Sequence, residues 1–571
     1  MRREAVIRIR AITGVVLFIL LIIIGRLYVV QIVHGAEYRE AGENQYVHTV
    51  RDLFSRGSIY MTTKDGEKVS AATVKTGYLL AIDPSKIADA EKTYEALSSI
   101  IPIDRDAFIA RASETDRAYA EIAPQVENDE ADAIDALNLP GVHLYRNQWR
   151  YYPGDSLAAR AIGFVGYDDN ALVGKYGLER YYNDTLTRRD EHLAVNFFAE
   201  IFSNLGDLIF DSKDTKEGDL VTTIEPSVER ALDQALQKSE DMWHGELSGG
   251  IIINPQTGEI YALDVDPSFN LNDRSGADLA MFRDPLVENV YEMGSIIKPL
   301  TVAAGLDAGV IVPSSTYYDA GCIELDGKRI CNYDGRARGT VPIQQILSQS
   351  LNVGVSHIAD LLGGERFRHY FYGLKLGSET GIDLPNETYG LVSNLESPRK
   401  VEYATASFGQ GIAMTPMETV RALSTLANGG KLITPHLVQR VEYGDGTVRD
   451  IAYPDGDQVF KKETTEDVTR MLVTVVDEAL RNGTVKNPYY SVAAKTGTAQ
   501  IADPVHGGYY PDKYLHSFFG YFPAYDPKFL IFLYTVEPKG VEYASETLTE
   551  PFMDLVHFLI NYYELPPDRG Q

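Results

Sequence analysis

Residues 11–33 (AITGVVLFILLIIIGRLYVVQIV) form an apolar run near the N-terminus of this 571-residue chain. As a helix this run would extend about 34 Å, which is enough to cross a bilayer. The preceding segment, MRREAVIRIR, is rich in arginine, which keeps the N-terminus cytoplasmic. We therefore expect residues 1–34 to be a cytoplasmic tip and a single-pass anchor in the cell (inner) membrane, with the rest extracytoplasmic. A cleaved signal peptide is the alternative, although Val33-His34-Gly35 fits a cleavage site only loosely.

The rest of the chain is too long for one ordinary hydrophobic core, so we expect two regions. Residues 35–218 mix short strands, acidic helices and polar turns, and contain no nucleophile beside a base. Residues 219–571 have strand patterns near both ends and helical patterns between them, which predicts one α+β domain with a sheet assembled from distant segments. The expected strands are 78–82, two within 249–263, 491–500, 516–525 and 528–538, and the expected helices are 128–138, 227–238, 295–308, 341–362, 415–428 and 551–563.

Charge and motif content exclude several classes of function. The net charge of −28 argues against nucleic-acid binding, which usually needs a basic patch or stripe. The 11 histidines show no H-E-x-x-H or similar spacing, and no Walker A loop occurs. We therefore expect no metal, no nucleotide and no other cofactor.

The only two cysteines, Cys322 and Cys331, flank the segment IELDGKRI. Asp326-Gly327 is a strong signal for a two-residue hairpin turn. Counting outward from this turn places the cysteines opposite each other in a non-hydrogen-bonded pair, with Cα atoms about 4.5 Å apart. A disulfide can bridge that separation in an oxidising compartment, and two free thiols are the alternative.

The segment Glu292 to Leu300 (EMGSIIKPL) carries a serine followed three residues later by a lysine. Residues three apart share one face of a helix, so Lys298 can reach the Ser295 hydroxyl and act as its base. Gly294 permits a tight entry, and the helix N-terminus favours a developing oxyanion. Lys298 must be neutral to act, and burial with a second nearby cation would lower its pKa.

Taken alone, each motif of this kind is weak. Ser397-Pro398-Arg399-Lys400 is a second S-x-x-K, which we interpret as a surface turn because no apolar helix follows it. Ser268-Phe269-Asn270 and Lys75-Thr76-Gly77 are likewise decoys for two further patterns, S-x-N and K-T-G.

Three motifs nevertheless occur in one informative order. Ser295-x-x-Lys298 is followed by Ser350-Leu351-Asn352 on a helical pattern, and then by Lys495-Thr496-Gly497-Thr498 on a β-like run. No set that includes a decoy completes this order. The ordered triple is the signature of penicillin-recognising serine enzymes.

With these motifs, the chain resembles the class B penicillin-binding proteins, the peptidoglycan D,D-transpeptidases, over nearly its whole length. Met293 stands where a proline is common, and Met61-Thr62 replaces a usual Asp-Arg, but neither departure touches the chemistry. The other segments similar to family boxes are Arg56 to Tyr60 (RGSIY), Gly174 to Asn183 (GKYGLERYYN), Pro255 to Ala262 (PQTGEIYA), Ser407 to Gly411 (SFGQG) and Asn482-Gly483-Thr484.

The resemblance implies roles for the first two motifs. Ser295 would attack the carbonyl of the penultimate D-Ala of a stem pentapeptide, and Lys298 would take its proton. Ser350 would relay a proton toward the leaving D-Ala. Asn352 would hold the substrate amide and contact Lys298.

The third motif would bind the donor terminus. Lys495, Thr496 and Thr498 would grip the terminal carboxylate, and Gly497 would let the strand approach the ligand. The backbone N–H groups of Ser295 and Thr498 would form the oxyanion hole. β-Lactams would acylate Ser295 as substrate mimics.

The resemblance also implies the architecture and the partners. The expected fold is a transmembrane helix, an elongated non-catalytic pedestal over 35–218, and a β-lactamase/transpeptidase-like domain over 219–571 with a five-stranded antiparallel sheet flanked by helices. Its substrates would be peptidoglycan stem peptides ending in D-Ala-D-Ala. A polytopic glycosyltransferase of the FtsW or RodA type would be its partner in the membrane.

Several alternatives remain. A division-type, FtsI-like enzyme is favoured by VYEMGSIIKP and ATASFGQGIAMTP, and an elongation-type enzyme by GKYGLERYYN. A D,D-carboxypeptidase would differ only in using water as acceptor. An inactive penicillin-binding scaffold or sensor would only recruit partners, and the intact triple argues against it. A β-lactamase is disfavoured because the one attractive E-x-x-x-N segment, Glu179 to Asn183, precedes Ser295. A bifunctional class A enzyme would need a glycosyltransferase domain where residues 35–215 carry class B boxes.

Overall fold

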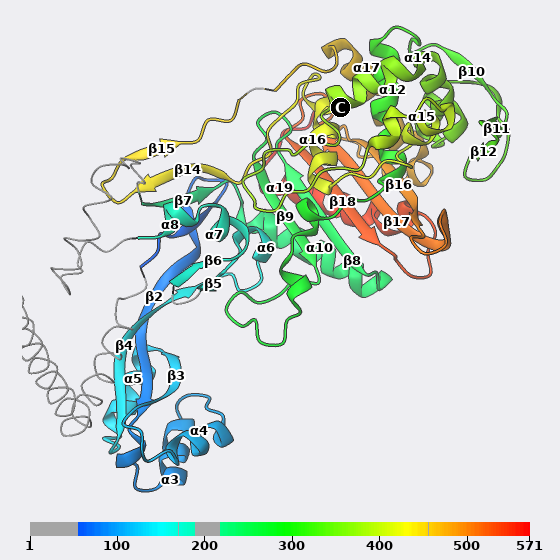
Figure 1. The fold of residues 1–571 in the computed structure, drawn as a ribbon. Helices are drawn as coiled ribbons and strands as arrows, with labels where there is room; N and C mark the ends of the chain where they lie inside the picture. Colours follow the sequence, from blue (N-terminus) through cyan, green and yellow to red (C-terminus); the bar gives the residue numbers. More distant parts are fainter. Residues whose placement is uncertain (1–54, 169–170, 189–216, 455, 571) are drawn as a thin grey trace, which may run out of the picture. The chain divides into compact units, whose positions relative to one another are not determined.

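The computed structural model describes residues 55–168, 171–188, 217–454 and 456–570. These residues fall into two compact units, one containing residues 74–151 and the other residues 57–73 and 152–570 (Figure 1). The predicted membrane anchor, residues 11–33, lies outside the described residues. Among the residues that are described, no helix is both long enough and apolar enough to span a bilayer.

The first unit has a small antiparallel sheet with helices packed on a core of its own. Tyr78 of one strand pairs with Val126 of the next, and Ile82 pairs with Ala120. The helices begin after acidic caps, of which Asp89 and Asp104 accept hydrogen bonds from the first turn. The expected strand 78–82 and helix 128–138 are confirmed. The elements are the second half of β2 (Lys68–Ile82), α3 (Ala90–Ser98), α4 (Arg105–Ala112), β3 (Ala120–Val126), α5 (Asn128–Ala136) and β4 (Val142–Tyr151).

The second unit contains two larger sheets within its described residues. In one of them, β1 (Ile59–Thr62) pairs in parallel with β7 (Gly218–Thr222) and antiparallel with the first part of β2. The sheet continues from β7 to β14 (Val438–Tyr443) and then to β15 (Val448–Asp450). The short elements α6 (Ala159–Ile162), β5 (Val165–Asp168), β6 (Ala171–Gly174), α7 (Gly177–Tyr181) and α8 (Asn183–Leu186) belong to the same unit.

The other sheet has five antiparallel strands among the residues described, as the family resemblance implies. Their order is β16-β17-β18-β8-β9, so strands from the two ends of the domain lie side by side. β16 is an edge strand, which leaves one side of its backbone open to a ligand. The strands are β8 (Leu247–Ile253), β9 (Ile260–Asp266), β16 (Ala493–Ala502), β17 (Tyr509–Phe522) and β18 (Phe529–Val536).

Helices cover both faces of this sheet, which explains its almost continuous apolar strands. Alternate residues enter different cores, because successive side chains point to opposite faces. Ile252 and Phe518 pack with α10 (Pro226–Trp243) and α19 (Thr549–Tyr562). Ile251 and Phe519 lie in the larger core, which also contains α12 (Lys298–Asp307), α14 (Asn352–Gly373) and α16 (Pro416–Ala427).

The expected helices of the domain are confirmed, with one correction. The predicted helix 341–362 is interrupted, because α13 (Gln344–Ser348) ends before Ser350 and α14 begins after it. The remaining elements include η3 (Leu279–Phe282), α11 (Pro285–Glu288), η4 (Gly294–Ile297), β10 (Thr316–Asp319), β11 (Cys322–Leu325), β12 (Lys328–Cys331), β13 (Gly339–Pro342), α15 (Lys400–Ala406), α17 (Lys462–Thr474), η6 (Val475–Ala479), η7 (Leu480–Gly483) and α18 (Ala544–Thr547).

Candidate active site

Ser295 lies in the 3-10 turn η4, which leads directly into α12. Gly294 has a left-handed backbone (φ +66°), and its N–H donates to the Gly409 carbonyl at 3.1 Å. A Cβ on Gly409 would lie 2.3 Å from the Gly294 oxygen, so the SFGQG box supports the serine turn through a close backbone contact. Ser295 is half-buried, and within the described part of the chain its hydroxyl makes no hydrogen bond. Such contacts commonly form only with substrate bound.

Lys298 is the first residue of α12 and is completely buried. Its Nζ donates to the Ser350 carbonyl at 2.6 Å and to Ser350 Oγ at 3.1 Å. Burial, together with the nearby cation of Lys495, holds the pKa of Lys298 well below its ordinary value. The lysine therefore meets the requirement that the sequence sets for a base.

Ser350 lies in the turn between α13 and α14, and not on a helix as its sequence pattern predicts. Its φ of +55° is in the left-handed region, which ends α13 and turns both the carbonyl and the hydroxyl toward Lys298. A serine at positive φ is uncommon and strained, and such residues cluster at functional sites.

Lys495 lies on the edge strand β16 and is 3% exposed. Its Nζ donates to Ser350 Oγ at 3.1 Å and to the Thr496 carbonyl at 2.8 Å. Burial lowers the pKa of Lys495 to about 7. Two lysines from different elements thus converge on one serine hydroxyl, and this convergence joins the three sequence motifs.

Gly497 and Thr498 are held by contacts that no sequence pattern predicts. A Cβ on Gly497 would lie 2.3 Å from Ser517 Oγ and 2.8 Å from the Met293 carbonyl. Ser517 Oγ also donates to that carbonyl at 2.8 Å, so Gly497 lets the serine turn pack directly on the sheet. Thr496 and Thr498 are half-buried, and Thr498 Oγ1 accepts a hydrogen bond from Ala544 N at 3.1 Å.

Asn352 begins α14, and its Nδ2 donates to the Cys331 carbonyl at 2.9 Å. Among the described residues it makes no hydrogen bond to Lys298, contrary to the expectation from the family. The β11–β12 hairpin has the predicted register, with Cys322 opposite Cys331. The structure joins these cysteines in a disulfide, with Cα atoms 4.1 Å apart.

Glu292 is a site residue that motif reading missed. Its carboxylate accepts from Gly411 N at 3.0 Å and from the Tyr509 hydroxyl at 3.0 Å. Burial raises the pKa of Glu292. These partners are 119 and 217 positions away in sequence, so no local spacing could indicate them.

Two decoy motifs lie in other surroundings. Lys400 is exposed at the start of α15 and pairs with Asp360 at 2.6 Å, so the second S-x-x-K has no buried base. Lys75 belongs to β2 and pairs with Glu127.

Comparison with known proteins identifies the family. The penicillin-binding protein transpeptidase domain matches residues 249–556, and the penicillin-binding protein dimerisation domain matches residues 54–197. Stage V sporulation protein D of Bacillus subtilis is 28% identical, over 95% of this chain and 83% of that protein. Peptidoglycan D,D-transpeptidase FtsI of Escherichia coli K12 is 26% identical, over 97% of this chain and 92% of that protein.

Solved structures agree in fold. Penicillin-binding protein 2X of Streptococcus thermophilus superposes with a TM-score of 0.70 at 20% identity, covering 90% of this chain and 81% of that one. Penicillin-binding protein 3 of Mycobacterium tuberculosis in its apo form superposes with a TM-score of 0.65 at 25% identity, covering 74% of this chain and 92% of that one. With its transpeptidase and dimerisation domains, this chain belongs to the class B penicillin-binding protein family.

Proposed function

We propose that this chain is a peptidoglycan D,D-transpeptidase that cross-links stem peptides through an acyl-enzyme on Ser295. The observation that carries this proposal is the buried Lys298, which follows the nucleophile by three residues and shares the Ser350 hydroxyl with Lys495. Several relatives, including Escherichia coli FtsI, are named peptidoglycan D,D-transpeptidases, which supports transfer over hydrolysis.

Acylation begins with attack of Ser295 Oγ on the carbonyl carbon of the penultimate D-Ala. The hydroxyl proton passes to the neutral Nζ of Lys298 as the C–O bond forms. The backbone N–H groups of Ser295 and Thr498 stabilise the oxyanion. The C–N bond then breaks, and the departing D-Ala amine takes a proton through Ser350, whose Oγ lies 3.1 Å from both lysine nitrogens.

Transfer reverses these roles. The amine of a second stem peptide attacks the ester carbonyl, loses a proton to the neutral Lys298 and Ser350 pair, and forms the new amide bond. Ser295 Oγ leaves and recovers its proton, so no proton or electron is gained or lost overall. Water in place of the amine would give the D,D-carboxypeptidase reaction.

The donor terminus is bound by the third motif. Lys495 supplies a cation, and Thr496 and Thr498 supply hydroxyl donors, for the terminal carboxylate. Asn352 holds the amide of the donor peptide. β-Lactams enter the same site and acylate Ser295.

The nucleophile is tested by labelling with a fluorescent penicillin. Ser295→Ala should abolish the covalent label, because the acyl-enzyme cannot form. Ser397→Ala, in the decoy S-x-x-K, is the matched control and should label like the parent protein. Label retained by the Ser295 variant would refute the assignment.

Among transpeptidases, a division-type role is the best supported. FtsI proteins of Escherichia coli and Caulobacter vibrioides are both among the relatives, at 26% and 28% identity. A fluorescently tagged copy should therefore concentrate at the septum. Uniform lateral labelling would favour the elongation type.

Residues 11–33 support a membrane anchor, with the transpeptidase domain on the extracytoplasmic side. A polytopic glycosyltransferase of the FtsW or RodA type would act beside it and supply the glycan strands. Accordingly, the purified chain should not polymerise lipid-linked precursor by itself. Sustained glycan synthesis by the pure protein would contradict this division of labour.

A further inference from the structure

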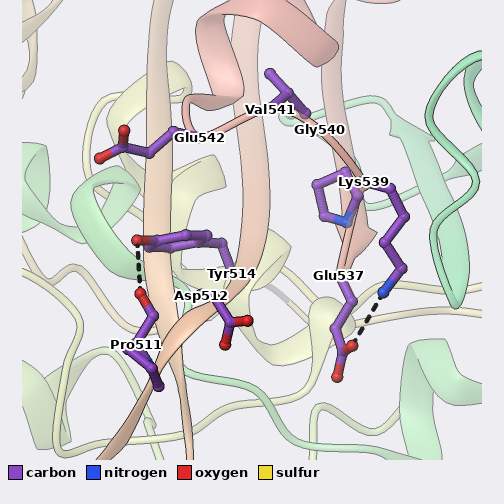
Figure 2. Close-up of a pocket in the computed structure, with 9 residues that line it drawn as sticks. Pro511, Asp512, Tyr514, Glu537, Lys539, Gly540, Val541 and Glu542 are labelled. Atoms are coloured by element: carbon purple, nitrogen blue, oxygen red, sulfur yellow. Dashed lines mark hydrogen bonds and ion pairs between the residues drawn. The ribbon is translucent and has the colours of Figure 1, made fainter.

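His516 lies on β17 directly opposite Thr498 of β16 and is completely buried. After β18 the chain passes through residues 537–543 to α18. Figure 2 shows part of this connection, from Glu537 to Glu542, beside Tyr514 and Pro511 of β17, where it borders a pocket of about 300 Å³. His516 joins the sheet to this connection at the position of Thr498.

Both ring nitrogens of His516 have partners beyond its own strand. Nε2 lies 3.0 Å from the Glu542 carbonyl, and Nδ1 lies 2.9 Å from Thr547 Oγ1. A carbonyl can only accept, so Nε2 carries a hydrogen. In the neutral ring Nδ1 is then an acceptor for the Thr547 hydroxyl, which also lies 3.3 Å from the Ala544 carbonyl. This assignment requires a neutral ring, and burial lowers the pKa of His516 to about 4.

These two hydrogen bonds flank Ala544 in the sequence, and Ala544 N donates to Thr498 Oγ1 at 3.1 Å. A closed circuit therefore runs from Thr498 across the strand pair to His516, through Glu542 and Thr547 to Ala544, and back to Thr498. Because Thr498 Oγ1 accepts from Ala544, its own hydrogen is free to point toward a ligand.

We infer that His516 is a positioning residue, which orients the Thr498 hydroxyl as a donor to the terminal carboxylate of the donor peptide. The inference rests on the proposed role of Thr498. His516 does not touch the substrate; it fixes the Ala544 N–H group, and that group sets the direction of the Thr498 hydroxyl. Loss of His516 should therefore weaken recognition of the carboxylate and leave Ser295 chemistry intact.

The test compares two thioester analogues of the acyl-D-Ala-D-Ala terminus, one ending in a carboxylate and the other in the corresponding amide. The second-order rate constant for acylation of the full-length protein is measured for each, and their ratio gives the carboxylate preference. His516→Ala should lower this preference about tenfold by slowing the carboxylate substrate, with the amide substrate changed less than about twofold.

Conservative variants of His516 should give carboxylate preferences between those of the parent and of His516→Ala. His516→Gln keeps a donor near Nε2, and His516→Asn keeps an acceptor near Nδ1, so each should retain an intermediate preference. Thr547→Val keeps a similar volume but removes the hydroxyl that contacts both His516 Nδ1 and the Ala544 carbonyl, so it should also lower the preference. His436→Ala, at another buried histidine, is the control for general loss of stability and should leave the preference unchanged.

The outcomes separate the inference from the proposal beneath it. Equal slowing of both substrates by His516→Ala, or an unchanged preference, would overturn the positioning role. Thr498→Val tests the proposed function separately. If Thr498→Val leaves the preference unchanged, the carboxylate role of Thr498 is wrong, and an effect of His516→Ala could not then act through it. If Thr498→Val lowers the preference and His516→Ala does not, the inference alone fails.

Discussion

Lys298 and Lys495 approach the same oxygen, Ser350 Oγ, from two buried positions. It is unfavourable for both lysines to be charged there, because burial and their mutual repulsion each disfavour the protonated form. The site resolves this conflict by lowering both pKa values, and the chemistry needs the two lysines in opposite states. Lys298 must be neutral to take a proton, while Lys495 must be charged to hold a carboxylate.

The rate of acylation by a penicillin should therefore depend on pH in a bell shape. On the acid side the second-order rate constant falls as Lys298 becomes protonated. On the alkaline side it falls as Lys495, whose pKa is lowered to about 7, loses its charge. The apparent pKa values of the two limbs are those of the free enzyme, and they describe the coupled lysine pair and not either lysine alone. Stopped-flow acylation from pH 5 to 10 measures the profile.

Lys495→Arg is the sharpest control for this assignment, because arginine stays charged throughout that range. The variant should react more slowly but lose the alkaline limb. An alkaline limb that survives unchanged in the arginine variant would assign it to a different group.

Lys298→Met should abolish acylation and yet stabilise the fold at pH 7. The pKa of Lys298 is lowered on folding, so burying this lysine opposes folding at any pH below its ordinary pKa of about 10.4. We expect the free energy of unfolding to rise by about 1–2 kcal/mol at pH 7, since methionine fills a similar volume without a charge. Urea denaturation at pH 7 and pH 10 provides the check: the gain should shrink toward pH 10, and destabilisation at both would contradict the argument.

At the scale of elements, the site depends on how η4 packs on β16. Gly497 of β16 allows this contact, and Gly409 allows the SFGQG segment to pack on the same turn, because a side chain at either position would meet backbone atoms of the serine turn. The sequence order of the three motifs predicts that these elements meet, and the strand patterns predict the sheet. The hairpin count also predicts the Cys322–Cys331 register.

Other features of the site could not be predicted, for identifiable reasons. No side-chain pattern signals that Ser350 adopts positive φ, since serine rarely does so and its neighbours are helical on both sides. Glu292 and His516 act through partners brought close only by the tertiary fold. Residues that recur in short motifs can therefore be predicted from the sequence, whereas residues that contact those motifs from distant positions in the chain cannot.

Gly497→Ala should push the serine turn η4 away from β16. The added Cβ would meet the Met293 carbonyl and Ser517 Oγ, and backbone cannot move aside without shifting the serine turn. We expect a loss of about 1–3 kcal/mol in the free energy of unfolding, as for other overpacked sites, and a fall of at least about a hundredfold in penicillin acylation. Gly444→Ala, where a Cβ would meet nothing within 4 Å, is the matched control and should be neutral in both measurements. Near-normal acylation by the Gly497 variant would show that the turn tolerates displacement.

At the scale of the whole molecule, the chain carries a net charge of −28, and two of its carboxyl groups, those of Glu229 and Asp264, are buried near each other. Glu229 of α10 is completely buried and accepts from Leu263 N of β9 at 2.9 Å. Burial and the nearby Asp264 raise the pKa of Glu229, and burial raises the pKa of Asp264 to about 8. These carboxyls lie where α10 packs on the face of the five-stranded sheet that α12 does not cover.

This pair should make the protein more stable at mildly acidic pH than at pH 8. A carboxyl whose pKa is raised on folding contributes stability that is fully present below its unfolded pKa of about 4 and is lost as pH rises through its folded pKa. Stability should therefore decline between about pH 4 and pH 8, the window set by Asp264.

General repulsion among acidic groups would give a slope of the same sign, so a charge-matched comparison is needed. Thermal unfolding at pH 5.5 and 8 should show a smaller difference in Tm for Glu229→Gln/Asp264→Asn than for the parent, because neutral amides do not titrate. Glu121→Gln/Asp512→Asn changes the net charge equally at two exposed positions and should keep the parent difference. If both double variants flatten the pH dependence alike, the slope arises from overall charge and not from the buried pair.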